Sequence, residues 1–148
     1  MDENRGLAMR EILFRGKRTD NGEWVQGDLL LDQDLEQAQI VWFEYKSTED
    51  GVERYGDGAI VDPETVGQYT GLTDKNGRKV FEGDIVERGD RIWIIEYDVK
   101  YAKFVMKTFT ERGVFWTRSF DLIPSEWCEV IGNIFDNPEL LKGGNNNG

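Results

Sequence analysis

Short apolar or alternating runs bounded by Gly, Asn or Asp recur along the whole chain, and they limit its fold more than any other feature. The runs are rich in Ile, Val, Trp, Phe and Tyr, which fit the pleated, half-buried surface of a β-sheet. Such spacing, with turn signals between the runs, is typical of a β-sandwich or barrel. We therefore predict a mainly β protein with strands at residues 12–15, 24–31, 40–45, 59–61, 66–69, 85–87, 92–97, 104–109, 114–117 and 130–134.

Few short helices are expected between these strands. One candidate is the segment 33–39, and a second is the segment 120–127, despite Pro124. A third is a helical turn at residues 138–141, where Asn137 is a suitable N-cap and a proline follows it. Helix is therefore predicted to be a minor part of the fold.

The ends of the chain and one internal segment have the composition of irregular structure. The polar segment 47–58 is expected to be an exposed, mobile loop. Residues 1–8 are expected to be a flexible extension, and residues 142–148, which end in GGNNNG, a disordered tail. Residues 9–141 are then predicted to form a single β-rich domain.

Part of the turn pattern occurs twice, at an offset of 55 residues that becomes 56 after one insertion. In each copy an aromatic residue and a Gly precede an Asn-Gly pair, and a Gly-Asp pair then leads into two apolar residues. We interpret units near residues 12–30 and 67–86 as an internal repeat, with chance as the alternative, because Gly, Asn and Asp crowd the turns of every β-protein. The residues predicted to serve these structural turns are Gly16, Asn21, Gly22, Gly27, Asp28, Gly71, Asn76, Gly77, Gly83 and Asp84.

The Gly-Asp pair followed by apolar residues commonly opens a strand of SH3-like barrels. Gly permits a sharp backbone, and the Asp carboxylate accepts hydrogen bonds from amides of the turn. The expected fold class is therefore a small SH3-like barrel-type β-domain with an internal duplication. A fold of this kind does not specify a function.

Length and composition favour one soluble domain. The chain has 148 residues, of which 39% are hydrophobic, and this is enough for one core. No apolar run approaches the roughly 18 residues of a membrane-spanning helix. The polar N-terminus lacks the apolar segment of a signal peptide, and the single Cys128 excludes an intramolecular disulfide. We therefore expect a protein of a reducing cytoplasm that does not associate with membranes.

The absence of histidine removes several kinds of chemistry. Histidine supplies most general bases near neutral pH and is the commonest transition-metal ligand, so Ser-His pairs, Cys-His pairs and structural zinc sites are excluded. Cys128 follows Trp127 and precedes apolar residues, and we expect a packed side chain without a catalytic role. No cofactor is expected.

Two groups of carboxylates were considered as sites. Asp32, Asp34 and Glu36 have the alternate spacing of a calcium loop, but the positions of its Gly and its bidentate Glu are not matched, so that site is rejected. Asp84 with the pair Glu96 and Asp98 is the nearest arrangement to a catalytic acid and base. We expect Asp84 to cap its own turn.

Net charge is −11, and the excess of acids is N-terminal. Residues 1–74 carry 17 acids against 7 bases, whereas residues 75–148 carry 12 against 11. An acidic surface repels phosphate backbones and favours basic partners, although it also serves solubility alone. In the less acidic half, bases interleave with aromatics in a way that suits nucleic-acid binding. These possible nucleic-acid-binding residues are Lys100, Lys103, Lys107, Arg112 and Arg118.

Three blocks of sequence carry a family resemblance. They are MREILFRGKRTDNGEWVQGDLL at residues 9–30, VDPETVGQYTGLTDKNGRKVFEGDIV at residues 61–86 and EVIGNIFDNPELL at residues 129–141. In this order they resemble the YopX family of bacteriophage and prophage proteins, whereas residues 31–60 carry no such signature. The resemblance implies a β-rich fold and expression from a mobile element in a bacterial cytoplasm, and it brings no catalytic residues.

Taken together, these features favour a non-enzymatic accessory protein that binds a host or phage protein. Its acidic N-terminal surface suits a basic partner, and in one specific form it mimics DNA. The alternatives are a nucleic-acid-binding protein and a carboxylate-dependent enzyme. Association with a second copy is a further possibility, because β-rich proteins of this size often cover their sheet edges in this way.

Overall fold

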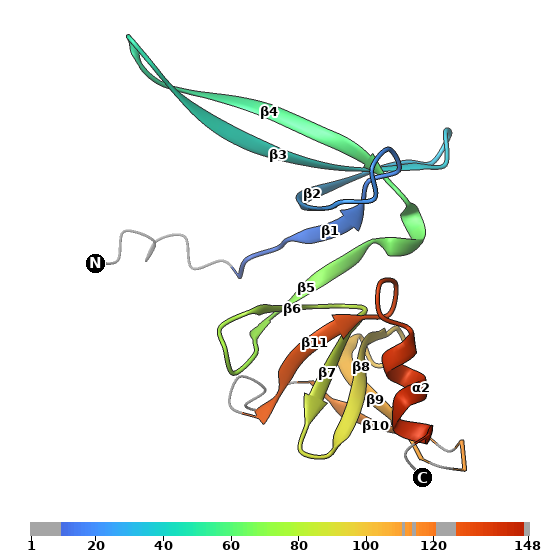
Figure 1. The fold of residues 1–148 in the computed structure, drawn as a ribbon. Coiled ribbons are helices and arrows are strands. Elements are labelled where there is room, and N and C mark those ends of the chain that lie inside the picture. The colour runs from blue at the N-terminus through green and yellow to red at the C-terminus, as the bar shows by residue number, and fades with distance from the viewer. Residues whose placement is uncertain (1–9, 111, 114, 121–126, 147–148) are drawn as a thin grey trace.

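The computed structural model describes residues 10–110, 112–113, 115–120 and 127–146. They form two antiparallel sheets, which confirms the prediction of a mainly β protein (Figure 1). The first sheet has the order β4-β3-β2-β1-β5-β6, with β1 (Phe14–Lys17), β2 (Trp24–Asp32), β3 (Gln37–Thr48), β4 (Gly51–Val61), β5 (Gly67–Thr73) and β6 (Lys79–Phe81). The second has the order β10-β9-β8-β7-β11, with β7 (Asp84–Arg88), β8 (Arg91–Asp98), β9 (Lys103–Phe109), β10 (Phe115–Ser119) and β11 (Glu129–Asn133).

In the described part of the chain two short helices accompany the sheets. The 3-10 helix η2 (Pro63–Thr65) joins β4 to β5, and the Asp62 side chain caps it by accepting a hydrogen bond from the Glu64 N–H. The α-helix α2 (Glu139–Asn146) follows β11 and lies beside the second sheet (Figure 1).

We call the hairpin of β3 and β4 the arm, and it projects away from the rest of the molecule (Figure 1). Its ladder runs from Ala38↔Val61 to Thr48↔Gly51, next to a two-residue turn. The partner strand β2 pairs with β3 only as far as Asp28↔Val41. Beyond that pair the arm is a two-stranded ribbon without a third strand.

Two separate cores stabilise the described residues. The larger lies on the second sheet and buries Trp93, Ile95 and Met106 together with residues of β6, β7 and β11. The smaller lies on one face of the first sheet and buries Ala38, Ile40 and Val61. The half-buried Trp42 is the residue farthest along β3 that packs against this core, so the core supports only the base of the arm.

Two sequence predictions about this region are wrong. The segment 33–39 is not a helix, because a turn precedes Gln37, and residues 37–39 begin β3. The segment 47–58 is not a loop, because it closes the β3–β4 ladder. A ladder is held by backbone hydrogen bonds and does not require apolar side chains, so the polar composition of this segment misled the prediction. The segment is exposed, as expected.

Near the C-terminus, the expected helical turn at residues 138–141 is present as the start of α2. Residues 142–146, predicted to belong to a disordered tail, continue this helix. Asn137 precedes the helix, but its side chain turns back and accepts a hydrogen bond from the Asn133 N–H at 3.1 Å. Most of the predicted helix 120–127 falls outside the described residues.

The barrel prediction is only partly supported. Within the described part of the chain both sheets have edge strands, β4 and β6 in the first and β10 and β11 in the second. The structure thus gives two open sheets, and the SH3-like detail is not confirmed.

The glycines of the predicted repeat have different roles in its two copies. Gly22 and Gly77 have positive φ angles of 75° and 82° in the two Asn-Gly turns. Gly83 has φ 93° at the corner between β6 and β7, and there the chain passes from the first sheet to the second. Its counterpart Gly27 lies inside β2, so the two copies diverge at the Gly-Asp pair.

Four residues predicted to serve turns lie inside strands, and Asp84 is the first residue of β7. Gly16 lies in β1, Gly27 and Asp28 lie in β2, and Gly71 lies in β5, where the pairing with β6 is irregular. A Cβ at Gly27 would lie 2.1 Å from the Val41 carbonyl oxygen. At this position glycine is required by the close approach of two backbones, which the sequence pattern does not distinguish from a turn.

Candidate functional site

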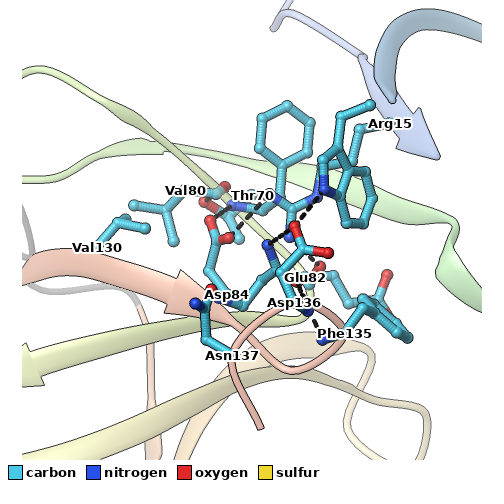
Figure 2. Close-up of polar contacts among 12 residues, drawn as sticks. Arg15, Thr70, Val80, Glu82, Asp84, Val130, Phe135, Asp136 and Asn137 are labelled. Carbon is cyan, nitrogen blue, oxygen red and sulfur yellow. Dashed lines mark hydrogen bonds and ion pairs between the residues drawn. The ribbon is translucent and has the colours of Figure 1, made fainter. Parts of the chain in front are cut away.

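The two sheets meet at Arg15 of β1 (Figure 2). Its Nη1 lies 2.8 Å from Asp84 Oδ1, and its Nη2 donates to the Glu82 carbonyl at 3.4 Å. The guanidinium carbon lies 4.8 Å from the ring centroids of both Trp24 and Phe81, so it is held between two aromatic faces. Arg15 and Asp84 are both buried. The pair is suited to fixing the sheets against one another rather than to contacting a ligand.

Asp136 makes a second connection at this junction (Figure 2). Its carboxylate accepts hydrogen bonds from Lys17 Nζ at 2.7 Å, Trp24 Nε1 at 2.6 Å and Asn133 Nδ2 at 3.3 Å. The Lys17 hydrogen bond, followed by that of Trp24, holds the pKa of Asp136 below its usual range. The turn after β11 is thereby tied to β1 and β2.

The three carboxylates predicted as a possible catalytic group have separate partners. Burial raises the pKa of Asp84, and its Oδ2 accepts a hydrogen bond from the Phe81 N–H at 2.7 Å, within the turn between β6 and β7. Glu96 lies 3.1 Å from Lys107 Nζ, and Asp98 accepts two backbone N–H groups of the turn after β8. Among the described residues no three Asp, Glu, Cys or His side chains are grouped to hold a metal ion.

The five basic residues predicted to bind nucleic acid are distributed over several surfaces. Lys103 and Lys107 share one face of β9, where Lys103 donates to a serine hydroxyl at 2.6 Å and Lys107 is 3.1 Å from a carboxylate of β8. Arg118 pairs in register with a core methionine and so lies on the opposite face. Lys100 and Arg112 lie in the turns at the two ends of β9. Nucleic-acid binding by these residues stays a prediction.

Cys128 is a buried member of the larger core. Burial, followed by the nearby Asp74 carboxylate, raises the pKa of its thiol to about 11. The thiol therefore stays protonated at neutral pH, which makes it a poor nucleophile.

Asp74 is a structural residue that the sequence analysis missed. Its Oδ1 accepts the N–H groups of Asn76 and Arg78, and its Oδ2 accepts that of Val130, all at 2.9 Å. Although burial opposes ionisation, these donors hold the pKa of Asp74 below its usual range. The sequence signal for this role is an Asp placed two residues before Asn-Gly, because the carboxylate of such an Asp accepts hydrogen bonds from backbone N–H groups of the turn.

The arm carries the surface best suited to contact another molecule. Alternation and register place the side chains at odd positions 39–47 of β3 and even positions 52–60 of β4 on one face of the arm. We call this face the open face. The opposite face carries the small core at its base. Apolar side chains on the open face, with Leu30 of the adjacent β2, are 44–69% exposed: Leu30 54%, Phe43 52%, Tyr45 69%, Val52 69% and Ile60 44%.

Charge is divided between the two faces of the arm. On β3 and β4 the open face carries one charged residue, Arg54, whose guanidinium lies 4.4 Å from the centroid of the Phe43 ring. The acids Glu44, Glu53 and Asp57 lie on the opposite face by the same register. A hydrogen bond with Glu44 raises the pKa of the Tyr55 hydroxyl on that face. The open face is thus apolar with one cation, and the other face is acidic.

These features define a small two-sheet β protein with an exposed apolar arm. The family model described as YopX protein matches residues 13–142, and the chain therefore belongs to the YopX family. A crystal structure of protein EF1440 from Enterococcus faecalis is similar in fold, with a TM-score of 0.52 and 26% sequence identity over 90% of this chain and 99% of that chain. No curated protein matches the sequence. Within the described residues no helix is long and apolar enough to cross a membrane.

Proposed function

We propose that this YopX-family protein is a non-enzymatic, phage- or prophage-encoded module that binds another polypeptide in the bacterial cytoplasm through the open face of the arm. The observation that carries the proposal is the exposure of Phe43 and Tyr45 on a hairpin that projects from both cores. Contiguous apolar patches of this kind on soluble proteins commonly mark interaction sites.

The surroundings of the open face support this reading. Aromatic residues and arginine are enriched where protein interfaces gain most of their binding energy, and here Arg54 is already stacked on Phe43. Beyond Val41 the arm is an isolated two-stranded ribbon, a structure that is marginally stable alone in water. A partner on the open face would supply the missing layer.

In a second form of the proposal, the acids of the opposite face bind a basic partner. Mimicry of DNA toward a nucleic-acid-binding protein is one case of this form. The two forms differ in their response to salt. Contacts between exposed charges are screened at high ionic strength, whereas burial of apolar surface is not weakened by added salt.

The test uses immobilised protein and a bacterial lysate that also contains a differently tagged copy of the same chain. We expect at least one polypeptide, either from the lysate or the tagged copy, to be retained at low and at high salt. The Phe43→Ser/Tyr45→Ser variant should lose it. Tyr55→Ser is the matched control, because Tyr55 is an exposed tyrosine on the opposite face of the same hairpin.

Equal retention by the double variant and the control would contradict a role for the open face. Elution at high salt, together with loss of binding in a Glu44→Gln/Glu53→Gln variant, would assign the contact to the acidic face instead.

A further inference from the structure

We infer that the polypeptide bound by the open face is a second copy of this chain, and that two arms pack face to face about a two-fold axis beside Phe43. This inference rests on the proposed function, because it names the partner of the same surface. The reason is that the open face matches itself when one arm is laid antiparallel on another.

The match follows from the order of side chains on β3. Its open-face residues, taken outward from the base, are Gln39, Val41, Phe43, Tyr45 and Ser47. Polar residues stand at both ends of this order, and the three between them are apolar or aromatic, so it reads similarly in both directions from Phe43. In a two-fold interface residue i contacts residue j and residue j contacts residue i, so an antiparallel pair of arms places the polar ends over one another and the apolar and aromatic residues over one another.

Strand β4 has apolar residues at both ends of the same register. Its open-face residues are Val52, Arg54, Gly56, Gly58 and Ile60, and Gly56 lies opposite Phe43. Reversal about Gly56 places Val52 over the partner's Ile60 and Arg54 over the partner's Gly58. The one cation on this face then meets a position with no side chain, and not a second cation.

The glycines also make the surface flat. A Cβ at Gly56 would lie 3.7 Å from Phe43 Cε1, and a Cβ at Gly58 would lie 3.0 Å from Val41 Cγ1, so the neighbouring side chains extend over the glycine backbone. Flat faces of strands suit sheet-on-sheet packing at a separation of about 10 Å.

The placement of the acids permits association with a second copy even though the chain carries a net charge of −11. In the paired arrangement the acids of both arms point away from the interface, because Glu44, Glu53 and Asp57 occupy the opposite face. The acids nearest the open face are Asp28 and Asp32 of β2, beside its base. Two acidic molecules can therefore join here without placing their arm carboxylates against one another.

The available area fits a specific but modest contact. Fully buried aromatic side chains contribute about 150–250 Å² each, so the exposed parts of Phe43, Tyr45 and their apolar neighbours amount to roughly 500 Å² per copy. Two copies would bury about 1,000 Å² from these side chains alone, near the lower limit for a specific interface.

The face of the first sheet that includes the open face is already covered by packing near β1. Alternation along β2 and its registers with β1 and β3 place Arg15 on the same face as Phe43. At β1 the second sheet covers this face through the Arg15–Asp84 pair. At β3 and β4 the apolar side chains remain exposed, and a second arm would complete the layer there.

The first experiment is sedimentation velocity of the purified full chain over a range of concentrations, at low and at high salt. We expect a monomer–dimer equilibrium that persists at high salt. Phe43→Ser/Tyr45→Ser should weaken dimerisation by at least about tenfold, since it removes two central aromatics. Tyr55→Ser should stay within about twofold of the wild type. A chain that is monomeric at every concentration, or equal weakening by both variants, would overturn the inference.

The second experiment tests the two-fold register and keeps the inference falsifiable if the double variant does not fold. The native thiol of Cys128 is buried and protonated, so single added cysteines can be joined selectively by a short bifunctional maleimide. Phe43→Cys should cross-link to itself. A mixture of Val52→Cys and Ile60→Cys chains should cross-link more than either chain alone, and Tyr55→Cys should not cross-link.

Failure of this inference can be told apart from failure of the proposed function. If the chain is monomeric in both experiments, yet a different polypeptide is retained from lysate by the wild type and lost by Phe43→Ser/Tyr45→Ser, the open face binds a heterologous partner and the dimer is rejected. If the open-face substitutions change neither self-association nor retention, both the dimer and the proposed function are rejected.

Discussion

The two sheets use the same residue types in different ways. In the second sheet Trp93, Ile95 and Met106 are buried in one core, which residues of neighbouring elements complete. In the arm of the first sheet Phe43 and Tyr45 lie on one face of β3, yet they remain exposed. Alternation therefore shows that one face of a strand is apolar, whereas a second layer decides whether that face is buried within the same molecule. The exposed face identifies the region where another chain can supply the layer.

The largest expected effect tests the connection between the two regions. Arg15→Ala leaves the buried Asp84 carboxylate without its charge partner, and we expect the free energy of unfolding to fall by about 3–5 kcal/mol. Lys17→Ala removes a partly exposed ion pair at the same junction and should cost less than about 1 kcal/mol. Urea denaturation followed by tryptophan fluorescence measures both. Similar losses in the two variants would show that the sheets do not depend on the buried pair.

The next effect compares the core of the second sheet with the open face directly. Ile95→Ala removes a fully buried side chain and should cost about 2–5 kcal/mol. Phe43→Ala should change the stability of the monomer by less than about 0.5 kcal/mol, because the ring is half exposed. Thermal or urea unfolding at a concentration where the monomer predominates measures the difference. A large loss in Phe43→Ala under these conditions would mean that the open face is covered within one chain.

A smaller effect separates two glycines of the first sheet. Gly27→Ala places a methyl group against the Val41 carbonyl, and we expect a loss of about 1–3 kcal/mol as β2 and β3 move apart. Gly56→Ala meets only ordinary contacts at 3.7 Å and should be neutral or slightly stabilising. Hydrogen exchange of β2 and β3 amides reports the local change. The expectation fails if Gly27→Ala leaves their protection unchanged.

The smallest effect depends on pH. Because the pKa of Asp136 is lowered in the folded protein, its contribution to stability is present above the ordinary Asp pKa of about 3.9 and is lost as pH falls through the folded value. Asp136→Asn should therefore cost less than about 1 kcal/mol at neutral pH, and the difference should shrink at acid pH. Unfolding curves recorded from neutral to acid pH measure this. A constant difference would show that the carboxylate charge does not stabilise the junction.

Much of the strand content could be predicted from sequence because the apolar runs and the Asn-Gly turns are local signals. Gly22 and Gly77 have positive φ in their turns, a conformation that glycine adopts without strain. The strand predicted at residues 40–45 lies in β3, whereas the segment 47–58 was predicted as a loop because it is polar and glycine-rich. Backbone pairing held by a short turn leaves little trace in hydrophobic periodicity.

The candidate site was harder to predict than the strands. The acidity of the N-terminal half is visible in the sequence, but its division between two faces of one hairpin depends on the β3–β4 register. Likewise, nothing near Arg15 in the sequence indicates that Asp84 is its partner, because the contact joins different sheets. Such pairings are set by tertiary packing, and a single sequence does not encode them as a local pattern.

The position of the arm in the chain has a consequence for synthesis. The pairing of β1 with β5 cannot form until β5 has been synthesised, because Phe14 pairs with Gln68 and the whole arm lies between them in the sequence. The β3–β4 ladder joins residues that are close in the sequence, and a hairpin of this kind can close within about 1–10 μs, whereas translation proceeds at roughly 5–20 residues per second. The arm can thus form, with its open face available, while the ribosome is still making the second sheet. If two arms pair as inferred, chains growing on neighbouring ribosomes of one message can meet before either has finished folding.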